Sequence, residues 1–260
     1  MAHQASHFRT VLALVLLGAL IPVLASLGSW QLRRATERDA VRMELARVAA
    51  LAPLQLDANT PPAAMQAWRK ASTRGHWLHD YSLLIGNRNL QGQPGYWVLT
   101  PLALDDGVTV LAVLRGWLAH DAVITQGRGG LAQRDGLADT LARERDTVAV
   151  QGELFAHVPR SLELWSLSGA PGEHLDWTPG TLPLVQNLEL DTLSRAMGHA
   201  LMPVVLAQEN GTLTHDWPHP SVDADTNRGY ALQWFSFCAI AAIAFAALAW
   251  RSLHSRSQES

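Results

Sequence analysis

The sequence is poor in cysteine, with Cys238 as the single cysteine among 260 residues. One chain therefore cannot form a disulfide, a CxxC redox pair, a CxxCH haem attachment or a cysteine zinc site. An excess of positive charge is also lacking, because the formal net charge is -3 at pH 7 and the pI is about 6.4. A chain with this net charge lacks the broad basic surface that binds a phosphate backbone, so we expect no nucleic acid partner.

Recognised catalytic motifs are missing as well. The sequence contains no GxSxG elbow, no HExxH, no GxxxxGK[ST] phosphate loop and no GxGxxG after a strand. Two close histidine pairs, His76 with His79 and His215 with His219, would each need further ligands from distant parts of the chain to bind a metal. Pro218 also keeps the second pair off a regular helical face. We therefore expect neither catalysis nor a metal site.

Two long runs lack charge altogether, at residues 10–32 and 230–250. At about 1.5 Å rise per residue, each is long enough to cross the roughly 30 Å hydrocarbon core of a bilayer. Trp30, Trp234 and Trp250 lie near the ends of these runs, as expected of rings at headgroup level. We predict a transmembrane helix from each run, with the lipid bilayer as a partner.

The residues that flank the runs bear on processing and topology. Arg9 before the first run, and Val23-Leu24-Ala25, which resembles a small-residue cleavage site, are also typical of a cleaved signal peptide, the alternative for this segment. Arg33, Arg34 and Arg38 by themselves favour a cytoplasmic position for the central part of the chain, but long translocated domains override loop charge. Because Arg251 and Arg256 favour a cytoplasmic C-terminus and two spans put both termini on one side, we predict cytoplasmic termini and an external central domain.

Between the runs, the pattern predicts several segments. Residues 33–52 carry apolar side chains at helical spacing and predict an amphipathic extension of the first helix. Residues 53–216 predict an extramembrane domain of short strands, with Asp105-Asp106-Gly107 as a hairpin turn, and residues 217–229 a linker. Strands are expected at residues 81–85, 96–102, 108–114, 147–154, 161–167, 182–188 and 202–208, and short helices near 60–68, 137–145 and 191–199. The fold class is thus a membrane protein with two transmembrane helices flanking a mainly antiparallel β domain, barrel or sandwich-like, with a few short helices.

Three stretches carry a more specific signal. They are GSWQLRR at residues 28–34, NRNLQGQPGYWVLTPL at 87–102 with LRGW at 114–117, and GYALQWF at 229–235. In this order they resemble the Surfeit locus protein 1 family of cytochrome c oxidase assembly factors, over nearly the whole chain. The resemblance implies a non-catalytic factor for maturation of the haem a/copper centre of oxidase subunit I. It also implies subunit I or the haem a synthase as partner. The family leaves a mitochondrial placement open, but no Arg- and Ser-rich presequence is seen ahead of the first run, so we expect the inner membrane of a bacterium with the domain in the periplasm.

The resemblance further implies haem a as a cofactor that such proteins hold or deliver. Members typically carry a histidine three residues before the Tyr-Ala of the second span, whereas this chain has Asn227 there. Asn is a poor iron ligand, which argues against direct ligation. Tyr230, Gln233 and Trp234 would then form a membrane-level contact surface.

Two arginines of the domain, Arg88 and Arg115, are the remaining candidates for cofactor binding. With the registry that the hairpins suggest, they lie near one end of one sheet, where they could bind a haem propionate or a neighbouring acidic side chain. Other functional classes stay open. One is a membrane-tethered hydrolase using residues around Glu173, His174 and Asp176, and another is a periplasmic small-ligand-binding module.

Overall fold

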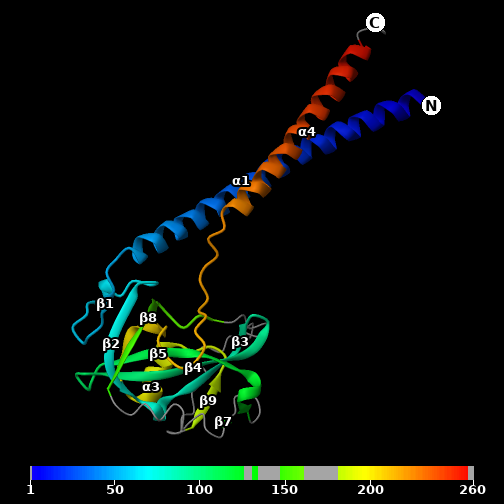
Figure 1. The fold of residues 1–260 in the computed structure, drawn as a ribbon. Helices are drawn as coiled ribbons and strands as arrows, with labels where there is room; N and C mark the ends of the chain where they lie inside the picture. The colour runs from blue at the N-terminus through cyan, green and yellow to red at the C-terminus, as the bar shows by residue number, and fades with distance from the viewer. Residues whose placement is uncertain (1, 126–130, 134–146, 161–180, 257–260) are drawn as a thin grey trace. The chain divides into compact units, whose positions relative to one another are not determined.

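The structure is a computed structural model, and it describes residues 2–125, 131–133, 147–160 and 181–256. It divides into a helical unit, residues 1–45 with 220–260, and a β unit, residues 46–219 (Figure 1). The expected strand at residues 161–167, the helix near 137–145 and the candidate hydrolase residues 173–176 lie outside the described residues.

The helical unit consists of two long helices, α1 (Ala2–Ala49) and α4 (Asp225–Arg256). The segments Phe8–Ala49 and Asp225–His254 are long and apolar enough to cross a membrane, which agrees with the two expected anchors. Helix α4 begins before the apolar run because Asp223 caps it: its carboxylate accepts hydrogen bonds from the backbone N–H of Asp225 (3.1 Å) and Thr226 (3.2 Å). Part of the expected linker is therefore helical.

The β unit is built from short strands and little helix, as expected. Its strands are β1 (Leu54–Gln55), β2 (Lys70–Trp77), β3 (Leu83–Leu90), β4 (Gln93–Leu104), β5 (Val110–Ala119), β6 (Ile124–Thr125), β7 (Leu131–Gln133), β8 (Val148–Phe155), β9 (Leu182–Val185) and β10 (Leu201–Gln208). The helical elements are α3 (Leu190–Met197) and the 3-10 turns η1 (Pro62–Ala64), η2 (His79–Tyr81) and η3 (His120–Ala122). Only the single turn η1 forms where a helix near residues 60–68 was expected.

Strands β2, β8, β10, β5 and β4 close into a ring, because β2 pairs with β4 in addition to its pairing with β8. Four of the five contacts are antiparallel and one, β10 with β5, is parallel. A ring with an odd number of strands cannot alternate direction all the way round, so at least one parallel pair is unavoidable. The expectation of a mainly antiparallel, barrel-like domain is confirmed.

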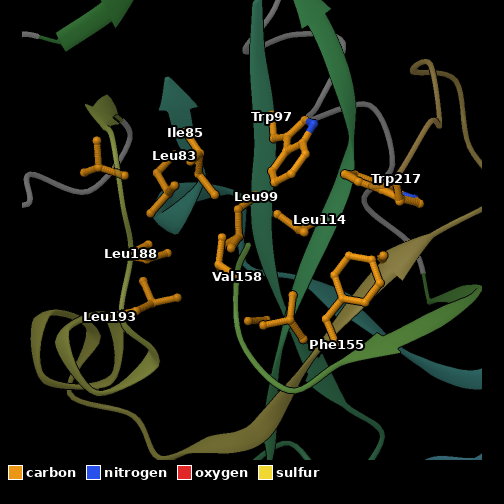
Figure 2. Packing of buried hydrophobic residues seen from close by; sticks show 14 of the residues in the cluster. Leu83, Ile85, Trp97, Leu99, Leu114, Phe155, Val158, Leu188, Leu193 and Trp217 are labelled. Atoms are coloured by element: carbon orange, nitrogen blue, oxygen red, sulfur yellow. The ribbon is translucent and has the colours of Figure 1, made fainter. Parts of the chain in front are cut away.

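Strand β5 is buried on both faces and separates two apolar clusters. Leu111 and Val113 belong to a cluster within the strands of the ring, together with Leu102, Leu154 and Leu206. On the other face, Val110, Ala112 and Leu114 pack in a second cluster that includes Leu99 of β4 and Leu193 of α3 (Figure 2). Two-sided burial explains why this strand is a continuous apolar run in the sequence rather than an alternating one.

Candidate functional site

The helical unit brings the first and third sequence motifs together, because α1 and α4 lie side by side (Figure 1). Gly28 packs against Phe235, where a Cβ added to the glycine would lie 2.8 Å from two ring carbons. Cys238 lies at the same interface, its Sγ 3.5 Å from the Ile21 carbonyl oxygen. The lone cysteine therefore serves as a small interface residue.

A pair of amides crosses the helix interface next to these apolar contacts. The Asn227 Nδ2 donates to the Gln31 Oε1 over 2.6 Å, and Asn227 is only 9 % exposed. The Asn227 Oδ1 is buried and has no hydrogen-bond partner among the described residues. An amide hydrogen bond of this kind fixes how two membrane helices pair, since the apolar surroundings offer few alternative partners.

Charged side chains continue the interface beyond the amide pair. The Asp39 carboxylate of α1 pairs with Arg228 of α4 and with Arg42, the latter over 3.1 Å. Arg228 also pairs with Asp225 over 2.7 Å, and Arg38 donates to the Asp223 carbonyl oxygen over 2.7 Å. The Asp223 carboxylate accepts from the Thr226 hydroxyl and backbone, which lowers the pKa of Asp223 below its ordinary value. These polar contacts set the register of α4 against α1.

The three residues of the expected contact surface do not share one environment. Tyr230 is 51 % exposed, and Gln233 is exposed, with no side-chain hydrogen bond among the described residues. Trp234 is half-buried and packs edge-on against Phe237, with ring centroids 6.2 Å apart. Tyr230 and Gln233 are therefore available to another molecule, whereas Trp234 partly packs within its own unit. Their role as a contact surface stays a prediction.

Arg88 of the β unit is buried beside the apolar cluster that contains Trp97. Its guanidinium lies 4.4 Å from the Trp97 ring centroid and donates to the carbonyl oxygens of Pro159 (2.8 Å) and Gln186 (3.2 Å). Burial lowers the pKa of Arg88 to about 10, which leaves it charged at neutral pH. Arg88 thus joins neighbouring segments of the domain, and its cofactor role stays a prediction.

Arg115 lies in a different environment. It is 4 % exposed and stacks over Trp77, with the guanidinium carbon 4.5 Å from the ring centroid. Trp77 belongs to the cluster within the strand ring, whereas Trp97, the partner of Arg88, belongs to the other cluster. The two guanidinium groups therefore stack on tryptophans of different clusters. Their binding of a haem propionate stays a prediction.

The motif in β4 and β5 holds a return segment, residues 213–219, whose last three residues the sequence assigned to a linker. The Trp117 backbone N–H donates to the Thr214 carbonyl oxygen over 2.7 Å, and a Cβ at Gly116 would lie 2.4 Å from the Leu213 Cβ. Trp217 packs against Trp97 at 5.5 Å between centroids and donates its indole N–H to the Gln208 carbonyl oxygen over 2.8 Å. A tryptophan within a predicted linker is the signal that could have revealed this segment.

Three histidines of these pairs form hydrogen bonds with other parts of the domain. His76 bonds the Thr147 hydroxyl (2.9 Å), His215 lies 3.1 Å from the Arg115 carbonyl oxygen, and His219 pairs with the buried Glu153 (2.9 Å). Among the described residues, no three His, Cys, Asp or Glu side chains gather as a metal site would require. The last contact ties the end of the return segment to β8.

Position 227 does not fit axial ligation of a haem. The Asn227 amide is buried at the helix interface, its Nδ2 is committed to Gln31, and its unpaired Oδ1 is enclosed by protein atoms. A carboxamide oxygen is also a weak ligand for haem iron compared with imidazole. The geometry instead makes Asn227 a helix-pairing residue.

Comparison with known proteins gives a consistent result. The model of the SURF1 family matches residues 18–239. Over 104 residues the chain is 29 % identical to the cytochrome oxidase assembly protein SHY1 of Saccharomyces cerevisiae. The matched region covers 39 % of this chain and 27 % of that protein. It is 29 % identical over 126 residues to a SURF1-like protein of Drosophila melanogaster, covering 42 % of each. The matches thus span less than half the length of either relative.

Proposed function

The chain belongs to the SURF1 family, and from this premise we propose that it is a membrane-anchored assembly factor for cytochrome c oxidase that has no catalytic activity of its own. The observation that carries the proposal is the match over residues 18–239, which includes the β unit and part of each helix of the helical unit. The name of the yeast relative, a cytochrome oxidase assembly protein, supports the same role.

The residues suggest how such a factor works. The amide pair and the Asp39–Arg228 ion pair hold α4 in one register against α1. A fixed helix pair presents exposed side chains of α4, including Tyr230 and Gln233, in a constant arrangement. We infer that this arrangement binds a membrane component of the oxidase, subunit I, or the haem a synthase while the haem a/copper centre is built.

We include handling of haem a in the proposal, but without Asn227 as a ligand of the haem iron. Haem a, when bound, would supply the redox centre destined for the oxidase. Arg88 and Arg115 are each stacked on a tryptophan in a separate cluster. The support for haem handling is the family role, and we assign no ligand residue.

For topology, we propose two spans in the inner membrane of a bacterium, with cytoplasmic termini and a periplasmic β unit. Exposed Arg9 and Arg251 lie at the ends of α1 and α4 that would face the cytoplasm, in agreement with the positive-inside rule. Reporter enzymes fused after residue 260 and inserted at the exposed Val108 turn should give opposite cytoplasmic and periplasmic signals. Equal signals from the two fusions would contradict this topology.

The test of the function is the reduced-minus-oxidised absorbance spectrum of membranes from cells with and without the gene. Deletion should remove the haem a band and keep the bands of other cytochromes, and the wild-type gene should restore it. The variant Asn227→His, in a purified protein, asks separately whether imidazole at this position binds haem. An unchanged haem a band in the deletion strain, with no second family member present, would overturn the proposal.

A further inference from the structure

We draw no further inference here: the strongest candidate, the pocket at the end of the strand ring lined by Trp77, Val150, Gln208 and Gly211, borders a buried Gln208 Oε1 with no hydrogen-bond partner among the described residues, but nothing in the structure shows which molecule would fill it.

Discussion

Gly28 of α1 lies so close to the ring of Phe235 of α4 that a Cβ at residue 28 would stand 2.8 Å from two ring carbons. The first and third sequence motifs are therefore coupled by packing, since each provides one side of this contact. The amide pair joins Gln31 of the first motif to Asn227, which lies two residues before the third motif. Their joint occurrence follows from a shared interface.

This close packing predicts that a side chain at residue 28 destabilises the helix pair. Gly28→Val should destabilise the helix pair by about 1–3 kcal/mol, because the new side chain must push the Phe235 ring aside. Gly18 provides the control: it also faces a phenylalanine, Phe245, but a Cβ there would lie at an ordinary 3.6 Å, so Gly18→Ala should be nearly neutral. Denaturant unfolding of the full-length protein in detergent measures both. Phe235→Ala should rescue Gly28→Val, and a lack of rescue would show that the clash lies elsewhere.

The amide pair predicts coupled effects of its two members. Gln31→Leu and Asn227→Leu should each destabilise the helix pair by about 1 kcal/mol, since each leaves the other amide without its partner. The double variant should lose less than the sum, because no unpaired amide then remains. Unfolding of all four proteins in detergent gives the coupling energy. Strictly additive losses would mean that the hydrogen bond does not contribute to helix pairing.

Much of this arrangement follows from the sequence, and the exceptions have physical causes. Charge-free runs predict the two helices, and the turn at residues 105–107 places β4 against β5, because both signals are local. Asp106 accepts from the backbone N–H of Val108 (3.2 Å) and of Thr109 (3.0 Å), as such a turn requires.

The faces of Arg88 and Arg115 were not predictable from alternation along the strands. The register of β3 with β4 shifts between Ile85 and Arg88, with Asn87 at a φ of 57°, and that of β4 with β5 shifts between Val98 and Leu99. An irregularity of this kind moves the following side chains to the other face, and no local residue pattern announces it. The parallel pairing of β10 with β5 is equally hidden, because it joins segments far apart in the chain.

The turn at Asp106 predicts a dependence of stability on pH. Hydrogen bonds from the Thr109 hydroxyl (2.6 Å) and backbone lower the pKa of Asp106 below its ordinary value of 3.8. The ionised carboxylate therefore favours the fold above pH 3.8, and this contribution is lost as pH falls through the lower value of the folded state. The Tm difference between wild type and Asp106→Ala should be constant near neutral pH and shrink in strong acid. Thermal unfolding at several pH values measures it, and a difference that grows on acidification would contradict the assignment.

The return segment predicts that one tryptophan of the expected linker is essential for the β unit. Trp217→Ala should cost about 3–5 kcal/mol, because it empties a site against Trp97 and removes the bond to the Gln208 carbonyl oxygen. Trp217→Phe keeps an aromatic ring but not the N–H, so its loss should be clearly smaller. Denaturant unfolding compares the two. Equal losses would assign the whole effect to the hydrogen bond.

Gly116 tests how the second motif holds this segment. Both Gly116 and Gly107 have a positive φ, but only Gly116 also packs closely against another part of the chain. Gly116 has a φ of 147° and a Cβ there would stand 2.4 Å from the Leu213 Cβ, whereas Gly107 has a φ of 71° with nothing within 4 Å. Gly107→Ala should therefore cost only backbone strain, about 1 kcal/mol. Gly116→Ala adds a clash with the return segment and should cost several kcal/mol. Hydrogen exchange locates the damage: the Trp117 amide, bonded to the Thr214 carbonyl oxygen, should lose protection in Gly116→Ala and keep it in Gly107→Ala. If both variants protect this amide equally well, Gly116 does not position residues 213–219 and the clash is absorbed elsewhere.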